Sequence, residues 1–297
     1  MTEKQLDSLH RFMLERAGVR GVWVRLEHSW QAIQSHASYP SGVLHRLGET
    51  FTAAALFTGH IKVEGRLSVQ LRGTGALRTL FAECTTEGTL RGIARYEEPL
   101  PLALTPASFG EGSLLAITIE TVAPGAREPV RYQGIVSLEA DSLAHAFENY
   151  FMQSEQLPTR ILLAATETHT AGLLIQQLPG QQEDWDAWPR VSALFDTLGN
   201  DELLETAHDT LLWRLFHEED VRLLDSKSLQ FACSCSRSRV EEVMQSLGKE
   251  EALASLEEEL ATVHCDFCGQ AYVFTRENIE NLFARPHPSA PGSGLLQ

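Results

Sequence analysis

The sequence contains no long hydrophobic run. Its longest apolar stretches, such as Ala53–Phe57, are far shorter than the ~20 residues that a transmembrane helix requires. The first 18 residues mix acidic and basic side chains and include no apolar segment of the kind found in a secretory signal. We therefore expect the protein to stay in the cytoplasm, where thiols are kept reduced.

Basic side chains are also in short supply. The chain has 24 Lys and Arg against 40 Asp and Glu, which gives a net charge of −16. A nucleic-acid surface needs basic residues to displace counterions, so we expect neither a nucleic-acid nor a membrane partner. Hydrophobic residues at 43% and charged residues at 22% are typical of a folded globular protein. We interpret the acidity as a means of keeping the protein in solution.

Residues 1–178 predict one α+β core domain built on an antiparallel sheet. Ile61–Arg72 alternates apolar and polar residues, which is typical of a strand with one buried face. Half-polar strands joined by short turns favour antiparallel pairing. Further strands are expected at Gly21–Glu27, Leu77–Glu83, Thr89–Tyr96, Leu114–Thr121, Arg131–Leu138, Thr159–Ala165 and Ala171–Leu178. Helices are expected at Val43–Phe57 and at Ser142–Ser154, the second behind Asp141 as its N-cap.

Residues 179–227 form the next segment, which we predict to be a helical linker. Pro179 and Gly180 interrupt the strand pattern, and apolar residues then recur at near-helical spacing from Trp185 to Phe216. Such spacing indicates amphipathic helices with one apolar face. We expect this linker to lie on the core domain and to cover apolar surface.

Residues 228–286 predict a small C-terminal zinc domain. Gly248 divides two helical patterns, and a hairpin pattern follows them. The expected elements are helices at Val240–Leu247 and Ala252–Leu260, hairpin arms at Val263–Cys265 and Ala271–Phe274, and a last helix at Ile279–Phe283. The tail, residues 287–297, is rich in Pro, Gly and Ser, and we expect it to be disordered.

Cysteine is scarce, and four of the five cysteines lie in this small domain. Cys233 and Cys235 are separated by one residue, 29 residues follow, and Cys265 and Cys268 are separated by two. Two closely spaced pairs are typical of a four-thiolate zinc site. In an extended segment, Cys233 and Cys235 point to the same side. We predict that these four cysteines bind one Zn²⁺ per chain.

A closed four-thiolate site leaves no open coordination position for a substrate, so we expect no enzymatic activity from it. A region of about 60 residues has a marginal core. Structural zinc supplies on the order of 10–16 kcal/mol to small metal-folded units, and whole domains are stable by about 5–15 kcal/mol. Loss of zinc should therefore unfold the region. Peroxide or hypochlorite would cause that loss, because an oxidised sulfur no longer acts as a ligand.

The spacing alone leaves two other interpretations open. One is a purely structural zinc-binding interaction protein, which would keep its metal in peroxide. The other is a thiol-disulfide oxidoreductase, whose CxxC should open a helix after a strand. Here Cys268 is followed by Gly269, which is free to take a left-handed conformation, and by the strand-like Ala271–Phe274. A nucleic-acid zinc ribbon is disfavoured, because residues 226–286 hold six basic and ten acidic side chains.

The other reactive or charged residues carry no assigned function. Arg237, Arg239 and His264 flank the cluster, and we interpret them as ordinary surface residues. Cys84 has no partner in the sequence pattern, and we interpret it as a buried thiol.

Several longer segments, together with the cysteine pattern, are similar to a known family. They are Arg131–Leu138, Glu148–Arg160, Leu212–Glu219, Phe231–Arg237 and His264–Gly269. The chain resembles the bacterial redox-regulated chaperones, the heat-shock proteins of 33 kilodaltons, whose pattern is CxC followed at a distance by CxxC. The similar segments span nearly the whole chain.

This resemblance implies an ATP-independent chaperone, or holdase, that binds unfolded or partly unfolded client proteins under oxidative stress. The reduced, zinc-bound form would be inactive. Oxidation would form Cys233–Cys235 and Cys265–Cys268 disulfides, release zinc, and unfold the C-terminal region and then the linker. The exposed apolar surface, expected near Trp185–Phe216 and on the core face beneath it, would bind clients, and the chain would form a homodimer.

Overall fold

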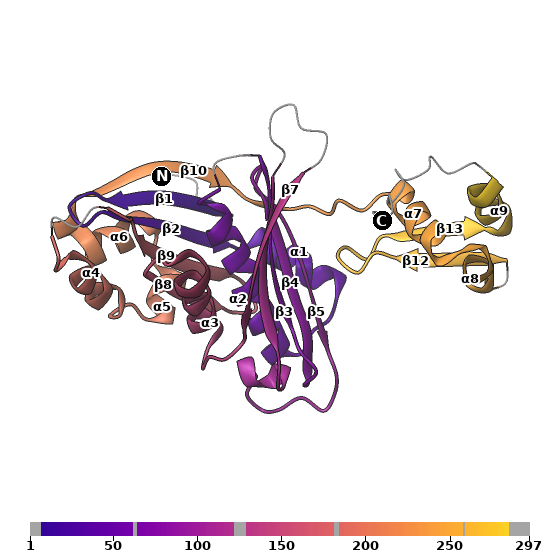
Figure 1. Ribbon diagram of the computed structural model, residues 1–297, viewed down its shortest axis with the longest axis horizontal. Helices are drawn as coiled ribbons and strands as arrows, with labels where there is room; N and C mark the ends of the chain where they lie inside the picture. Colours follow the sequence, from indigo (N-terminus) through magenta and orange to yellow (C-terminus); the bar gives the residue numbers. More distant parts are fainter. Residues whose placement is uncertain (1–6, 62–63, 122–128, 181–183, 258, 285–297) are drawn as a thin grey trace, which may run out of the picture. The chain divides into compact units, whose positions relative to one another are not determined.

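The computed structural model describes residues 7–61, 64–121, 129–180, 184–257 and 259–284. The chain divides between Ala232 and Cys233 into two compact units, each described separately below (Figure 1). Helices pack with sheets whose strands are antiparallel except for one short pair, so the predicted α+β class is confirmed. No helix among the described residues is long and apolar enough to cross a membrane.

The first unit contains a five-stranded sheet in the order β10-β1-β2-β9-β8, with every neighbouring pair antiparallel. Its strands are β1 (Ser8–Leu14), β2 (Val19–Leu26), β8 (Thr159–Ala165), β9 (Thr170–Gln177) and β10 (Val221–Ser228). Its central strands β2 and β9 are buried on both faces. The expected strands in this sheet are confirmed, whereas β1 and β10 were not predicted.

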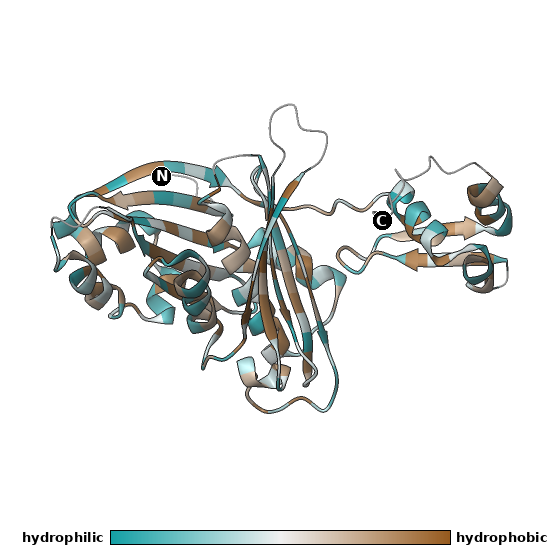
Figure 2. Ribbon diagram, viewed as in Figure 1, coloured by the Kyte–Doolittle hydropathy of each residue, from teal (hydrophilic) through white to brown (hydrophobic). Residues whose placement is uncertain are grey.

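A second sheet of six strands has the order β11-β5-β4-β3-β6-β7. Its strands are β3 (Gly65–Arg72), β4 (Leu77–Thr85), β5 (Thr89–Tyr96), β6 (Leu114–Thr121), β7 (Val130–Ser137) and β11 (Gln230–Phe231), with a short helix η1 (Pro106–Phe109) before β6. Figure 2 shows hydrophobic stretches along these strands. Apolar residues alternate along β3, where Leu67, Val69 and Leu71 are buried, as the period-two pattern predicted.

Helix α2 (Ser41–Thr58) contacts strands of both sheets and forms the centre of the main core. Every residue from Thr50 to Thr58 is buried, as expected of a helix in a protein interior. Gly48 permits this close packing, because a Cβ there would lie 2.8 Å from the Cβ of Ala165 on β8. The predicted helix at Val43–Phe57 is confirmed. Helix α1 (His28–His36), which was not predicted, precedes it.

The face of the five-stranded sheet opposite α2 is covered by three helices, which we call the linker helices. They are α4 (Ala187–Phe195), α5 (Asn200–Glu205) and α6 (His208–Phe216), followed by the short η3 (His217–Glu219). Their apolar sides form a second core with Phe12, Trp23 and Ile175 of the sheet. The predicted helical character of this segment is confirmed from Ala187 to Phe216, and residues 181–183 lie outside the described part. It is wrong from Val221 onward, because that stretch pairs with β1 as strand β10. The action of the whole segment as a separable linker stays a prediction.

Two local expectations in the first unit are wrong. Ser142, rather than Asp141, caps helix α3 (Leu143–Tyr150), since its Oγ accepts a hydrogen bond from the backbone N–H of His145 at 3.2 Å. Both residue types cap well, and the extended backbone of Ser142 decides between them. The helix continues as the π-helical η2 (Phe151–Glu155). The strand expected to begin at Ile61 begins at Gly65, because the N–H of Ile61 closes the turn after α2.

The second unit consists of α7 (Arg237–Leu247), α8 (Lys249–Ala254), a hairpin of β12 (Leu260–His264) and β13 (Ala271–Thr275), and α9 (Arg276–Ala284). Among the described residues of this unit, five buried side chains form the core: Met244, Ala252, Ala261, Phe274 and Ile279. The helix predicted at Ala252–Leu260 is wrong beyond Ala254, because Leu260 pairs with Thr275 in the hairpin. The predicted tail, residues 287–297, lies outside the described residues.

Candidate metal centre

The four cysteines of the second unit come from two segments that the fold brings together. Cys233 and Cys235 lie in the extended stretch before α7, and Cys265 and Cys268 lie in the turn between β12 and β13. The turn is closed by hydrogen bonds from Gly269 N–H to Cys265 C=O at 2.8 Å and from Cys265 N–H to Gln270 C=O at 3.0 Å. Gly269 has a φ of 67°, the left-handed conformation expected for it.

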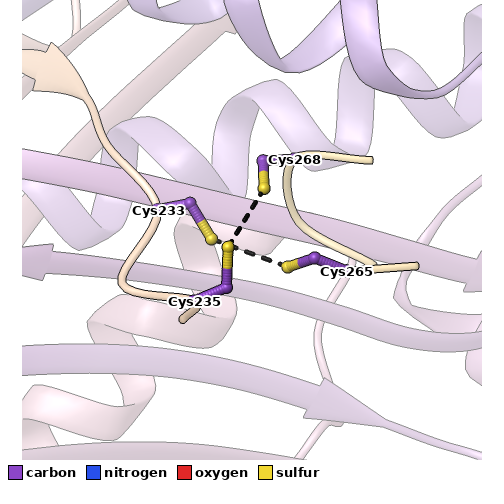
Figure 3. A group of neighbouring side chains, drawn as sticks. All are labelled: Cys233, Cys235, Cys265 and Cys268. Atoms are coloured by element: carbon purple, nitrogen blue, oxygen red, sulfur yellow. Dashed lines mark hydrogen bonds between the residues drawn. The ribbon is translucent and has the colours of Figure 1, made fainter. Parts of the chain in front are cut away.

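The four sulfur atoms form one cluster, with all Sγ atoms within 4.8 Å of one another (Figure 3). The short contacts cross between the two segments: Cys233 Sγ lies 3.6 Å from Cys265 Sγ, and Cys235 Sγ lies 3.4 Å from Cys268 Sγ. A tetrahedral zinc with Zn–S bonds of about 2.3 Å separates its sulfurs by about 3.8 Å. The cluster can therefore hold a metal ion, and both its donor atoms and its dimensions fit zinc.

Burial and hydrogen bonds shift the pKa values of Cys233, Cys235 and Cys268 in different directions. Burial opposes ionisation of Cys235, but hydrogen bonds from Tyr272 and from the neighbouring cysteines lower its pKa to about 7. Burial, followed by hydrogen bonds with the other three cysteines, raises the pKa of Cys268 to about 12. Burial also raises the pKa of Cys233. Metal binding must displace the protons that these thiols share, so we expect the metal affinity to fall as pH falls.

Tyr272 contacts the cysteine cluster, and the sequence pattern did not predict this contact. Its hydroxyl donates a hydrogen bond to Cys235 Sγ at 3.1 Å, and this bond raises the pKa of the phenol to about 12. Tyr272 pairs with Val263 across the hairpin, two residues before Cys265. Only the pairing of β12 with β13, together with the approach of the Cys235 segment, places this hydroxyl at the cluster.

The two flanking arginines support the backbone around the cluster. The Arg237 guanidinium lies 4.2 Å from the ring centre of Phe274 and donates to the carbonyl of Val273. Arg239 donates to the carbonyl of Ser234 at 2.5 Å. His264 is an exposed residue of β12. All three residues are exposed, as their interpretation as surface residues predicts, and the two arginines in addition bond the neighbouring backbone.

Cys84, the fifth cysteine, belongs to the first unit and not to the unit that carries this centre. It lies on β4 in the first unit and is fully buried. Burial raises the pKa of its thiol to about 12, which leaves it protonated and unreactive at neutral pH. The interpretation of Cys84 as a buried thiol is confirmed.

The family model described as Hsp33 protein matches residues 7–275. The chain belongs to the Hsp33 protein family. The match includes both sheets, the linker helices and all four clustered cysteines. The resemblance inferred from the sequence segments is thereby confirmed.

Relatives and a solved structure agree with membership of the Hsp33 family. The chain is 42% identical over 293 residues to the 33 kDa chaperonin of Ectopseudomonas mendocina, covering 96% of this chain and 98% of the relative. It is 41% identical over 278 residues to the 33 kDa chaperonin of Nitrosococcus oceani, covering 93% and 94%. The crystal structure of the Thermotoga maritima 33 kDa chaperonin superposes with a TM-score of 0.82 at 21% identity, covering 94% and 98%, and shows the same fold.

Proposed function

We propose that this protein is a redox-regulated, ATP-independent chaperone that binds unfolding proteins under oxidative stress. The observation that carries the proposal is the cluster of four cysteine sulfurs in a small unit of an Hsp33-family chain. Relatives at about 40% identity over nearly their whole length are named chaperonins, which supports the chaperone role. A cytoplasmic location belongs to the proposal, because a reducing compartment keeps such thiols free.

In the resting state, Cys233, Cys235, Cys265 and Cys268 would hold one Zn²⁺ per chain. The bound ion would link the segment before α7 to the turn of the hairpin. Its contribution to stability would be decisive, because the apolar core of this unit has only five buried side chains among the described residues. Zinc binding of about 10–16 kcal/mol is folding energy in units of this kind.

Oxidation would join the sulfurs within each motif, as Cys233–Cys235 and Cys265–Cys268. Each pair of thiolates would lose two electrons to one hydrogen peroxide and form one S–S bond. That peroxide would take up two protons and leave as two waters, and zinc would depart as Zn²⁺. The shortest sulfur contacts instead join Cys233 to Cys265 and Cys235 to Cys268.

The choice between these two pairings decides whether the unit can open. Disulfides across the segments would keep them linked where zinc linked them, and the unit would stay folded. Disulfides within each motif would leave the segments unconnected and free to separate. We propose the pairing within motifs, which the resemblance to the Hsp33 family implies, and peptide mapping of the peroxide-treated protein would test it.

Client binding would follow from release of the linker helices. Their apolar sides pack on one face of the five-stranded sheet, against Phe12, Trp23 and Ile175. Unfolding of the second unit would remove the folded anchor that follows the linker. The freed helices and the uncovered sheet face would then bind the exposed apolar segments of clients, and the same surface would support a homodimer.

The experiment follows zinc release and chaperone activity in the same samples. The reduced protein is treated with peroxide under mild heat, zinc is measured with a chromogenic chelator, and aggregation of a thermally unfolding client is recorded. We expect one zinc per chain to leave as protection of the client appears, and a thiol reductant to reverse both. A variant with all four clustered cysteines replaced by serine should release no zinc, and Cys84→Ser should behave as the parent protein.

The same experiment separates the alternatives. Zinc that stays bound in peroxide would favour a purely structural zinc module. Insulin reduction at catalytic rates would favour a thiol-disulfide oxidoreductase. The geometry disfavours that enzyme, because Cys265 and Cys268 lie in a hairpin turn followed by β13 rather than at the start of a helix.

A further inference from the structure

The Tyr272 side chain connects the two segments that carry the cysteines. It belongs to β13, on the same hairpin as Cys265 and Cys268, yet its hydroxyl donates to the sulfur of Cys235 on the other segment at 3.1 Å. Its ring packs against the small core of the second unit, which fixes the direction of the hydroxyl. The sulfur that receives this bond lies 3.4 Å from Cys268 Sγ.

We propose that Tyr272 is a positioning residue of the metal centre, whose hydroxyl hydrogen-bonds Cys235 Sγ in the metal-bound state and thereby sets how readily the cluster is oxidised. The inference rests on the proposed metal centre. It adds the residue that adjusts how fast peroxide oxidises the cluster. Outer-shell hydrogen bonds of this type orient metal ligands and adjust their electron density.

The chemistry follows from the charge on the sulfurs. Four thiolates around one Zn²⁺ carry a net charge of −2, and an O–H donor draws electron density away from the sulfur that it contacts. Peroxide oxidation begins when a thiolate sulfur attacks one peroxide oxygen, which forms a sulfenate and releases water. A sulfur with less electron density attacks more slowly. The hydroxyl should therefore delay oxidation and strengthen the link between the segments.

Tyr272→Phe tests this role, because it removes the hydroxyl and leaves the ring in the core. We expect peroxide to release zinc about 3- to 10-fold faster from the variant, and we expect the metal affinity to fall by about 10-fold, the lower end of the effects of outer-shell substitutions. Tyr132→Phe makes the same chemical change on the exposed β7 of the first unit and should leave both quantities unchanged.

A spectroscopic measurement separates tuning from a loss of structure. Cobalt(II) loaded in place of zinc reports the sulfurs through its sulfur-to-metal charge-transfer bands. Loss of a hydrogen bond makes one thiolate richer in electrons, so these bands should move to lower energy in Tyr272→Phe while the far-ultraviolet circular dichroism stays unchanged. A merely structural role of the ring would leave the band energies unchanged.

A second substitution keeps the hydroxyl and strengthens it as a donor. Site-specific 3-fluorotyrosine at position 272 has a more acidic phenol, so zinc release by peroxide should be slower than in the parent protein. Equal release rates and equal cobalt spectra for the parent, the phenylalanine and the fluorotyrosine proteins would overturn the inference and leave the proposed function standing. A parent protein without tetrathiolate cobalt bands would overturn both.

Discussion

Glu219 is a buried carboxylate whose charge is matched by Arg190 of helix α4. Its side chain accepts hydrogen bonds from Arg190 Nε at 2.6 Å and from Nη2 at 3.1 Å, while Arg190 also pairs with Asp184. Glu219 is 2% exposed, so the loss of its partner would leave an unpaired charge away from water. The ion pair thus joins α4, the first linker helix, to η3, the short helix that follows α6.

Arg190→Met should destabilise the first unit by about 2 kcal/mol. Removing one partner of a fully buried pair costs about 3–5 kcal/mol, and the effect here is smaller because the Arg190 side chain is 36% exposed to screening water. Urea unfolding followed by tryptophan fluorescence measures the change.

Adding Glu219→Gln should restore part of the stability. Arg214→Met, which breaks an exposed pair, should cost less than about 1 kcal/mol, and equal losses in the two arginine variants would contradict the role of the buried pair.

His10 of β1 and His208 of α6 stack face to face where a linker helix meets the sheet. Their ring centres lie 3.7 Å apart. Burial, followed by the charge of His208, lowers the pKa of His10 to about 4, and burial lowers that of His208, while Asp209 opposes both shifts. The folded state therefore favours the two neutral rings.

Acidification should loosen this contact. A histidine whose pKa is lowered by folding contributes its full stability above the unfolded value of 6.5, and loses it as pH falls from 6.5 towards about 4. We expect His10→Gln to reduce the loss of unfolding free energy between pH 7.5 and pH 5, measured by urea titration at both values. Identical losses in the variant and the parent protein would refute the assignment. Comparing the two proteins cancels the contribution of the carboxylates.

At the scale of elements, helix α6 has one buried and one exposed side. Leu211 and Leu212 are buried against the sheet, whereas Trp213 is 66% exposed. Leu211→Ala would leave a cavity in the second core and cost about 2–5 kcal/mol. Since that core is what holds the linker helices on the sheet, the reduced variant should protect a client from aggregation without peroxide.

Trp213→Ala supplies the matched control on the same helix. Exposed substitutions usually change stability by less than about 0.5 kcal/mol, so this variant should stay inactive until it is oxidised. A Leu211→Ala protein that is destabilised but remains inactive when reduced would show that the linker helices do not guard the client surface.

The elements that the sequence patterns missed share a physical cause. Strand β10 is exposed along most of its length, so its residues show no apolar alternation. Strand β1 places Leu9 in one core and Phe12 in the other, and its pattern of burial departs from a simple period of two. Strand β1 is held by pairing with both β10 and β2, and β10 by pairing with β1; the β1–β10 partners are distant in the chain and leave no local signal.

At the scale of the whole molecule, the two units should respond differently to metal removal. A chelator under reducing conditions should abolish amide protection in α7, α8 and the β12–β13 hairpin, because five core side chains cannot replace the binding energy of zinc. The sheets of the first unit should keep their protection, since their strands stay hydrogen-bonded to one another and pack with α2 in a large core. Hydrogen exchange read by mass spectrometry measures both units in one sample, and a hairpin that stays protected would contradict the prediction.

Features that depend on local pattern and residue chemistry could be predicted from the order of the amino acids. Period-two alternation located most strands, helical spacing located α2 and the linker helices, and cysteine spacing predicted the centre whose four sulfurs the fold gathers within 4.8 Å. The tertiary structure alone decided which partners meet across distance. It placed the Tyr272 hydroxyl on Cys235, His10 on His208, and Arg190 on Glu219. Such contacts depend on how separate elements pack, and packing is a property of the folded chain as a whole rather than of any local run of residues.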